Sequence, residues 1–309
     1  MSEHAFGEGA ISRCKHCKAL RSRKGKGFIY SAPEGRDWFA EPSECPGILQ
    51  LEALVLERGG YPVSVDAPAG GGLMLTESGW RSREIVFFDL ETTGLDPRTN
   101  VPTEVGFVRG KLVEDGPNGL GVEVLDRYKS LCFVPESLAD KARETEAITG
   151  ISYDELKGAP HFAFVAHQVR EFLSAGAPDA LLASFNAHFD VPFLGYAHVR
   201  CGEELHPILQ RQEVLDPMLW SRKLDKYAKG GHKLVTVAER KKVVDPAELA
   251  GAHRADFDAE IGLRVLAYFA RDARVPESLE ELWLWQQMVQ GEWAANFFDY
   301  KIKKLREGR

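Results

Sequence analysis

The chain has 309 residues, 44% of them hydrophobic, which is enough to bury the core of one large domain or of two smaller ones. Its formal net charge of −7 argues against a protein that binds nucleic acid by bulk positive charge. No apolar run approaches the ~18 residues of a membrane span, and the first residues contain no apolar block typical of a signal peptide. We therefore expect a cytoplasmic protein that does not enter a membrane.

Residues 1–65 are predicted to form a small N-terminal module that contains three grouped cysteines. Cys14 and Cys17 have the Cys-x-x-Cys spacing of half a zinc site, and Cys45 is a candidate third ligand. No fourth ligand is evident from the spacing. A region of this size would gain stability from a structural Zn²⁺, and three reduced thiols in a small fold are the alternative.

The same module contains a basic segment, residues 13–26, which carries seven lysines and arginines and no acid. Two aromatic residues follow it directly. Basic side chains beside aromatic rings suit a nucleic-acid strand, through phosphate contacts and base stacking, and a solvated basic loop is the alternative. The candidate nucleic-acid patch consists of Arg21, Arg23, Lys24, Lys26, Phe28 and Tyr30.

A glycine- and proline-containing stretch, residues 66–80, predicts a linker to the next domain. Beyond it, β-branched and aromatic content predicts strands over residues 85–90, 103–109 and 128–134. Because no long helix separates these strands, we expect them to form an antiparallel meander.

Helices and strands then alternate along the chain. Apolar spacing predicts helices over 160–173, 187–200 and 255–270, and a short buried strand over 181–185. Pro217 suits the first turn of a further helix that is capped by Asp216. This order predicts a mixed α/β sheet flanked by helices.

The C-terminal extension, residues 273–309, is rich in helix-forming residues. Its aromatic side chains predict one helix, or a pair of helices, that docks on the domain, and binding of a protein partner is the alternative. The aromatic residues are Trp283, Trp285, Trp293, Phe297 and Phe298.

Two carboxylates lie two positions apart in the apolar segment Ile-Val-Phe-Phe-Asp-Leu-Glu-Thr-Thr-Gly. On a strand, Asp89 and Glu91 point to one face, whereas Leu90 points to the other. Carboxylates on one face repel each other unless a cation lies between them, and hard oxygen ligands favour Mg²⁺ or Mn²⁺ over zinc. The alternative is a pair of strand-end carboxylates that face water.

A third acid, Asp190, ends the segment Ser-Phe-Asn-Ala-His-Phe-Asp at the exit of a predicted strand. Asn186 is expected to act in part as a helix N-cap, which places Asp190 in the first turn, facing the strand ends. A favourable interaction with the helix N-terminus is the alternative role of Asp190. His188 is expected to lie at the surface.

The segment His-Arg-Ala-Asp-Phe-Asp supplies His253 and a fourth acid, Asp258. A lone histidine is usually structural or exposed, but one beside a metal-bound water can act as a general base near neutral pH. Asp256 and Glu260 are alternative acids on the same helix, and their spacing places them on other faces than Asp258.

The three segments resemble the exonuclease motifs of the DnaQ-like DEDDh 3′–5′ exonucleases, the family that includes the proofreading epsilon subunit of bacterial replicative polymerase. The order and separations of the motifs also match, and the resemblance covers roughly residues 82–272. It implies an RNase H-like fold for an exonuclease domain over 81–272. It also implies a two-metal mechanism that cuts the 3′ terminal phosphodiester and releases a nucleoside 5′-monophosphate.

The resemblance also implies roles for the individual residues. Asp89, Glu91 and Asp258 would hold one Mg²⁺ or Mn²⁺, Asp89 and Asp190 would hold a second, and His253 would take a proton from the attacking water. Leu95 would wedge the terminal base or belong to the core. Glu104 would support the site or form a salt bridge. The candidate substrate-binding residues are Thr92, Gly94, Leu95 and Asn186.

The leading hypothesis is therefore a 3′–5′ exonuclease whose partner is a nucleic acid with a free 3′ end. A proofreading or accessory subunit of a larger complex is one alternative. A non-catalytic nucleic-acid-binding adaptor on the same fold is the other, and the presence of all five motif residues argues against it. The sequence does not separate DNA from RNA, or single strands from double strands.

Overall fold

The computed structural model describes residues 11–13, 20–24, 27–31, 79–115, 119–211, 213–251 and 253–306. The chain divides into two compact units, one formed by Leu73–Gln286 and the other by Met1–Gly72 with Gln287–Arg309. Among the helices in the described ranges, none is long and apolar enough to cross a membrane. The predicted zinc ligands Cys14, Cys17 and Cys45 lie outside the described residues, as does Lys26 of the predicted nucleic-acid patch.

The described N-terminal residues form an antiparallel sheet in the order β1-β2-β3. Its strands are β1 (Ile11–Arg13), β2 (Leu20–Lys24) and β3 (Gly27–Ser31). The pairing places Arg21 opposite Tyr30 and Arg23 opposite Phe28. Two basic positions of the predicted patch are thus paired with its two aromatic positions.

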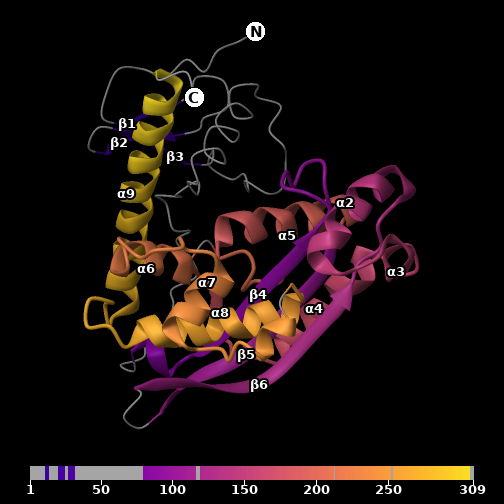
Figure 1. Cartoon of the computed structure of the whole chain (residues 1–309), viewed down its shortest axis with the longest axis horizontal. Helices are drawn as coiled ribbons and strands as arrows, with labels where there is room; N and C mark the ends of the chain where they lie inside the picture. The colour runs from indigo at the N-terminus through magenta and orange to yellow at the C-terminus, as the bar shows by residue number, and fades with distance from the viewer. Residues whose placement is uncertain are drawn as a thin grey trace. The chain divides into compact units, whose positions relative to one another are not determined.

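The larger unit is built on a five-stranded sheet in the order β6-β5-β4-β7-β8 (Figure 1). Its strands are β4 (Glu84–Thr92), β5 (Pro102–Glu114), β6 (Leu120–Leu131), β7 (Leu181–Ala183) and β8 (Val214–Leu215). β4, β5 and β6 pair antiparallel, as the predicted meander requires, whereas β7 and β8 are parallel to β4. The third strand was predicted over 128–134, and these bounds are wrong. β6 begins at Leu120 and ends at Leu131, because the long strand β5 pairs with it over this whole length.

Helices follow the meander and alternate with the short strands. They are α2 (Ala139–Thr149), α3 (Tyr153–Lys157), α4 (Phe162–Ser174), α5 (Ala187–Cys201), α6 (Pro217–Leu224), α7 (Leu234–Lys241), α8 (Ala255–Ala270) and α9 (Leu279–Arg306). The bounds of α4, α5 and α8 agree with the apolar spacing. The sequence analysis did not predict α2, α3 or α7. The C-terminal extension forms a single helix, α9, over its described residues.

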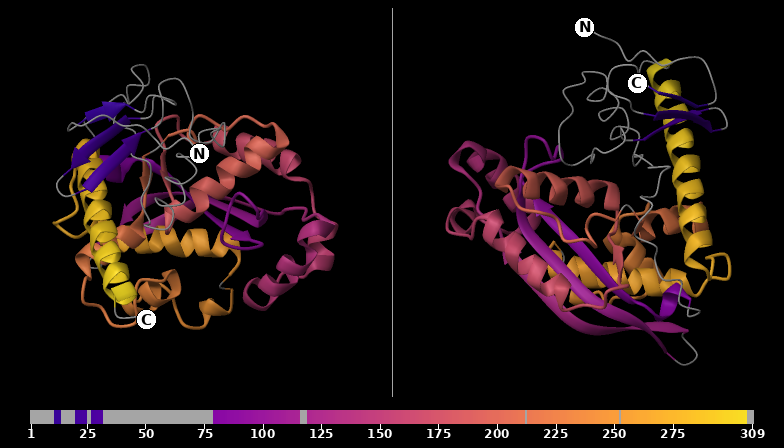
Figure 2. Two further views of the ribbon diagram at one scale, coloured as in Figure 1. Left: turned by 90° about the horizontal axis from the view of Figure 1, so that it is seen from above. Right: turned by 180° about the vertical axis from the view of Figure 1, so that it is seen from behind.

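Helices cover both faces of the sheet (Figure 2). Side chains that alternate along a strand therefore point toward one helical layer or the other. On one face, α8 comes so close to β4 that a Cβ on Gly262 would meet the Phe87 ring at 2.3 Å. On the other face, the Phe107 ring contacts Phe88, and it also contacts Phe172 of α4. Asp89 and Glu91 have the same parity as Phe87, so they share the face that α8 covers.

The first turn of α8 packs closely against β5 at Gly106. A Cβ on Gly106 would lie 2.1 Å from the backbone carbon of Ala255, a distance that only a residue without a side chain allows. This contact fixes the first turn of α8 on the sheet. Asp258, in the same part of α8, is thereby brought to the face that carries Asp89 and Glu91.

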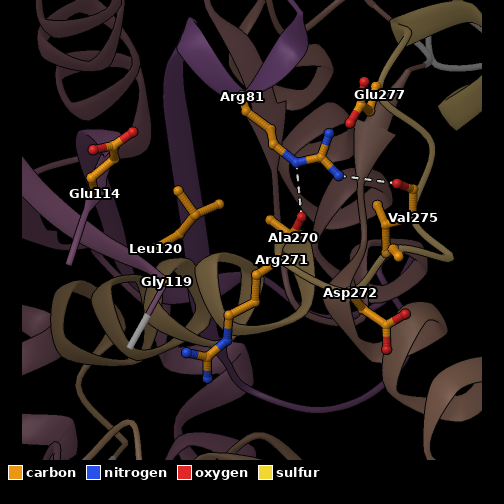
Figure 3. A pocket seen from close by; sticks show the side chains of 10 residues that line it. Arg81, Glu114, Gly119, Leu120, Ala270, Arg271, Asp272, Val275 and Glu277 are labelled. Atoms are coloured by element: carbon orange, nitrogen blue, oxygen red, sulfur yellow. Dashed lines mark hydrogen bonds between the residues drawn. The ribbon is translucent and has the colours of Figure 1, made fainter. Parts of the chain in front are cut away.

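The other end of α8 is held by an arginine from the 3₁₀ helix η1 (Trp80–Ser82). Arg81 Nε donates to the carbonyl oxygen of Ala270 at 2.8 Å, and Arg81 Nη2 donates to that of Val275 at 3.0 Å (Figure 3). Cationic donors near a helix C-terminus satisfy its last carbonyl groups. Arg81 also lines an open pocket of about 560 Å³ that contains none of the predicted catalytic residues.

Candidate active site

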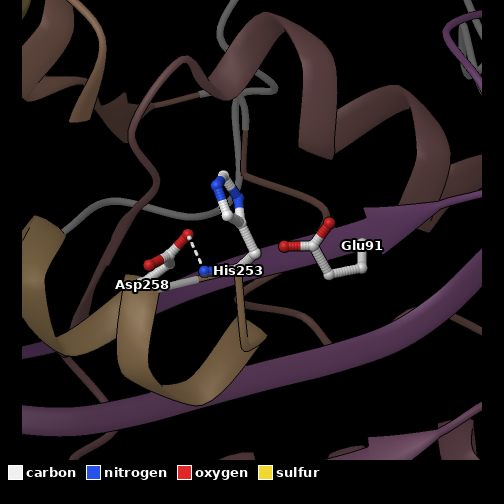
Figure 4. A group of neighbouring side chains, drawn as sticks. All are labelled: Glu91, His253 and Asp258. Carbon is white, nitrogen blue, oxygen red and sulfur yellow. Dashed lines mark hydrogen bonds between the residues drawn. The ribbon is translucent and has the colours of Figure 1, made fainter. Parts of the chain in front are cut away.

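The tightest group of predicted site residues is Glu91, His253 and Asp258. Each offers one potential ligand atom, and these atoms all lie within 4.8 Å of one another. His253 lies between the two acids (Figure 4), and its backbone N–H donates to Asp258 Oδ2 at 3.3 Å. One strand and one helix start, far apart in the sequence, thus bring three polar side chains to one place.

Burial is the main reason why the carboxyl groups around this cluster have a raised pKa, and neighbouring acids add to it. Burial raises the pKa of Glu91 to about 8, with a further contribution from Asp258. Burial also raises the pKa of Asp258 to about 6, although the nearby His253 opposes the shift. The pKa of Asp89 is raised well above its usual value by burial and then by Asp190, Asp258 and Glu91. Asp89 is therefore electrostatically linked to all the other predicted ligands.

Asp190 is buried in the first turns of α5. Its Oδ2 accepts a hydrogen bond of 2.6 Å from the Ser184 hydroxyl, which holds the carboxylate from the end of β7. Burial raises the pKa of Asp190 to about 8, while the Ser184 hydrogen bond acts in the opposite direction. The sequence analysis did not assign any role to Ser184.

The donor set fits divalent cations. Four carboxyl groups are withdrawn from water and have a raised pKa, so their ionised forms are disfavoured unless a cation compensates the charge. Carboxylate oxygens are the ligands that Mg²⁺ and Mn²⁺ prefer, and a histidine at the edge of such a group is compatible with Mn²⁺. A cation among these groups would favour their ionised forms and lower the repulsion.

The segment before α8 is fixed by Glu104, a fully buried residue of β5. Glu104 accepts hydrogen bonds from the Arg254 guanidinium and from the backbone N–H of Ala255. His253, next to Arg254, has a left-handed backbone with φ of 67°, which is uncommon for a residue other than glycine. Glu104 was expected either to support the site or to form a salt bridge. It forms a salt bridge with Arg254, and this salt bridge also holds the segment that carries His253.

A second buried acid, Asp216, joins the starts of two helices. Its Oδ1 accepts from the backbone N–H groups of Met218, as a cap of α6, and of Asn186. Its Oδ2 accepts from the backbone N–H of Ala187. Asn186 occupies the N-cap position of α5 in a left-handed conformation, but its side chain makes no cap hydrogen bond. The expected cap is therefore supplied by Asp216 from a distant part of the chain.

Three other residues near the motifs also have defined surroundings. The prediction that His188 lies at the surface is wrong, because it is half-buried and burial lowers its pKa to about 4. The alternative acids on α8 face β6 and are engaged there. Asp256 pairs with Lys129 at 2.8 Å, and Glu260 pairs with Arg127.

The loop after β4 presents Leu95 to solvent. This side chain is 85% exposed, so the alternative that it belongs to the core is wrong. The loop beneath it is pinned, since the Thr93 hydroxyl contacts Asn100 Oδ1 and Arg200 Nη1 donates to the carbonyl oxygen of Asn100 at 2.6 Å. Thr92 donates its hydroxyl to the carbonyl oxygen of Gly94 at 2.7 Å. An exposed apolar side chain on a rigid loop is suited to contact a flat ligand.

The exonuclease family model matches residues 86–266, a range that contains all five predicted catalytic positions. The chain belongs to the exonuclease family. The mixed sheet flanked by helices is the RNase H-like architecture that the motif resemblance implied. Membership supports a nuclease that hydrolyses nucleic acid.

Relatives and solved structures share only part of their length with this exonuclease-family chain. The PolC-type DNA polymerase III of Halalkalibacterium halodurans is 32% identical over 195 residues, which are 62% of this chain and 12% of that protein. The Bacillus subtilis protein of the same name is 27% identical over 191 residues, or 61% of this chain and 11% of that protein. Exonuclease I of E. coli in complex with a dT13 oligonucleotide is similar with a TM-score of 0.47 and 17% identity, over 63% of this chain and 42% of that one.

Proposed function

We propose that the chain is a metal-dependent 3′–5′ exonuclease that removes nucleoside 5′-monophosphates from the 3′ end of DNA or RNA. The observation that carries this proposal is the group formed by Glu91, His253 and Asp258, whose potential ligand atoms lie within 4.8 Å of one another beside Asp89. In a family of exonucleases, acids gathered in this way are suited to bind divalent cations at a scissile phosphate.

The four acids would together coordinate two Mg²⁺ or Mn²⁺ ions. Asp89, Glu91 and Asp258 would hold one ion, and Asp89 with Asp190 would hold the other. The bound ions supply Lewis-acid polarisation of the phosphoryl oxygens and a more acidic water. Ser184 orients the Asp190 carboxylate through its 2.6 Å hydrogen bond, so that the carboxylate is already in place when the substrate arrives.

His253 acts as the general base and accepts a proton from the attacking water at a ring nitrogen. Its backbone N–H donates a hydrogen bond to Asp258, and the residue is exposed, so the ring is accessible to a substrate. Imidazole is suited to this role near neutral pH. Thr92, Gly94, Leu95 and Asn186 hold the terminal nucleotide, with Leu95 packed against its base.

A proofreading subunit is a second candidate, and the PolC-type relatives favour it. In this case α9 would provide a surface for the polymerase partner. A cytoplasmic location agrees with this role. Copurification of the full chain with a replicative polymerase would support the second candidate, whereas efficient digestion by the isolated chain would support an independent nuclease.

The N-terminal residues would assist the proposed function. The proposed module over 1–65 would hold one structural Zn²⁺ through Cys14, Cys17 and Cys45 and would bind the substrate through its basic patch. Metal analysis of the purified protein tests the zinc site. Less than about half an equivalent of zinc would contradict it.

The proposed activity is tested with 5′-labelled DNA and RNA oligonucleotides and Mg²⁺. We expect stepwise shortening from the 3′ end by the wild type. Asp89→Ala and His253→Ala should reduce the rate by about 10²–10⁴-fold, because each removes a group that acts on the reacting atoms. Asp256→Asn is the matched control, since Asp256 lies on α8 but pairs with Lys129. Undiminished cleavage by Asp89→Ala would contradict the mechanism.

A further inference from the structure

A basic loop with an exposed aromatic ring connects α6 to α7. We define it as residues 225–233, with the sequence Asp-Lys-Tyr-Ala-Lys-Gly-Gly-His-Lys. Together with the adjoining parts of α6 and α7, the segment 222–242 has eight lysines and arginines and only two acids, in a chain of net charge −7. Positive charge is thus concentrated locally on an acidic protein, and such a concentration is typical of a surface that meets phosphates.

Tyr227 is the most prominent side chain of this loop. It is 90% exposed, compared with 55% for Phe164, another exposed aromatic residue. Lys226 Nζ lies 5.8 Å from the centre of its ring, and Lys226, Lys229 and Lys233 are all exposed. An aromatic face among exposed ammonium groups can stack on a base while the lysines contact the neighbouring phosphates.

The loop is held in a defined shape from both of its ends. The Ser221 hydroxyl and His232 Nδ1 are 2.8 Å apart, which joins α6 to the last part of the loop. Arg240 Nη1 donates to the carbonyl oxygen of Gly231 at 2.9 Å, and Asp225 pairs with Lys241 of α7. Because these bonds already order the backbone, binding a ligand at Tyr227 would cost little additional conformational entropy.

The helices that carry the loop are attached to the candidate active site. Asp216, which caps α6, also binds the backbone of Ala187 at the start of α5, the helix of Asp190. The 8 residues of α6 therefore separate the loop from this point by about 12 Å. In Figure 1, α6 and α7 lie beside α8, the helix of Asp258.

We propose that the basic loop binds a single-stranded stretch of the substrate on the 5′ side of the nucleotide that enters the candidate active site. Tyr227 stacks on an unpaired base, and Lys226, Lys229 and Lys233 bind phosphates. The inference rests on the proposed exonuclease function. A continuous duplex would not fit, because its bases are already stacked on each other and offer no free face to the ring.

Binding of fluorescein-labelled oligothymidylate to the full chain, measured by anisotropy in EDTA, tests the inference without hydrolysis. We expect Tyr227→Ala to weaken binding about tenfold or more, and Tyr227→Phe to retain the affinity, because the ring carries the contact. Phe164→Ala is the matched control and should leave binding unchanged. Unchanged affinity of Tyr227→Ala would overturn the proposal, and so would an equal loss of affinity for a blunt duplex.

Salt dependence tests the lysines separately. Each phosphate contact to a single strand contributes about −0.7 to the slope of log K against log salt, so replacing Lys226, Lys229 and Lys233 by Gln should reduce the slope by about 2. A Lys111→Gln, Lys157→Gln double variant, altered elsewhere on the surface, should retain the wild-type slope. An unchanged slope in the triple variant would contradict the phosphate contacts.

A small substrate separates this inference from the proposed function. The p-nitrophenyl ester of thymidine 5′-monophosphate is too short to reach from the catalytic acids to the loop. We expect the loop variants to hydrolyse it at the wild-type rate in Mn²⁺ while they lose affinity for the oligonucleotide. If the wild type cleaves neither the ester nor any oligonucleotide, the proposed function is contradicted. The loop inference is tested independently by the binding measurements.

Discussion

Glu104 and Arg254 form a salt bridge beside the predicted general base, with Glu104 Oε1 only 2.6 Å from Arg254 Nη2. The other carboxylate oxygen accepts from the backbone N–H of Ala255 at 2.9 Å. We expect Glu104→Ala to lower the free energy of unfolding by about 1–3 kcal/mol, because it leaves a buried N–H unsatisfied. Exonuclease activity should fall by about 10- to 100-fold, since His253 and Asp258 lose their support. Denaturant titration and the oligonucleotide assay measure the two effects.

Glu104→Gln separates positioning from simple loss of stability. Its amide oxygen can still accept from the Ala255 N–H, so stability should fall less than in Glu104→Ala. Asp140→Ala removes an exposed ion pair with Arg143 and is the control, with an expected change within about 0.5 kcal/mol. Wild-type activity in Glu104→Ala would show that the salt bridge does not position His253.

A methyl group at Gly106 should separate the start of α8 from β5. The added Cβ would lie 2.1 Å from the backbone of Ala255, and backbone can give way only by moving the helix. We expect Gly106→Ala to lower the free energy of unfolding by about 1–3 kcal/mol or more and to impair activity. Gly291→Ala, where a Cβ meets nothing within 4 Å, should instead raise the stability of α9 by about 0.5–1 kcal/mol. Equal effects of the two substitutions on thermal unfolding would contradict this packing.

Leu95 offers a test of substrate binding that leaves the core intact. Its side chain is 85% exposed, so Leu95→Ala should change the unfolding free energy by less than about 0.5 kcal/mol. If Leu95 packs against the terminal base, the substitution should reduce kcat/KM about 5- to 50-fold, in line with the loss of one apolar contact in a binding site. Leu284→Ala, at a position 60% exposed, is the matched control and should keep wild-type kinetics.

The acids of the candidate site predict an unusual pH dependence for the metal-free protein. The pKa is about 8 for Glu91 and for Asp190, far above their ordinary values of 4.5 and 3.8. Between the ordinary pKa of each group and a pH of about 8, the folded chain binds protons that the unfolded chain releases. This proton binding stabilises the folded state, and the stabilisation is lost as the pH rises toward 8. We therefore expect the free energy of unfolding in EDTA to increase when the pH is lowered from about 8 to about 6.

Substitution and metal addition check the origin of this effect. Glu91→Gln and Asp190→Asn remove a titrating carboxyl group, so each should flatten the pH profile and stabilise the metal-free protein at high pH. Mg²⁺ or Mn²⁺ should stabilise the wild type most at high pH, where the acids are ionised. A pH profile in EDTA that is identical in the wild type and both variants would contradict the raised pKa of these two buried acids.

Local spacing was sufficient to predict several elements of the fold. The apolar segment around Asp89 predicted a buried strand, and the apolar face of residues 255–270 predicted α8 with its observed bounds. α2 was not predicted because most of its residues are polar, and α7 was not predicted because its apolar segment, Leu-Val-Thr-Val-Ala, is short for a helix. The short strand β8 owes its assignment to pairing with β7, a partner that local sequence does not reveal.

The sequence by itself determined the chemistry that the chain can offer. A spacing of two on a strand places Asp89 and Glu91 on one face whatever the rest of the fold, and the motif order indicated the exonuclease family. Only the tertiary structure decided how the site is supported. Glu104 meets Arg254 across 150 residues, and Asp216 caps a helix that starts 29 residues before it. Such partners are brought together by packing of the sheet and helices, and no periodicity within either segment encodes their contact.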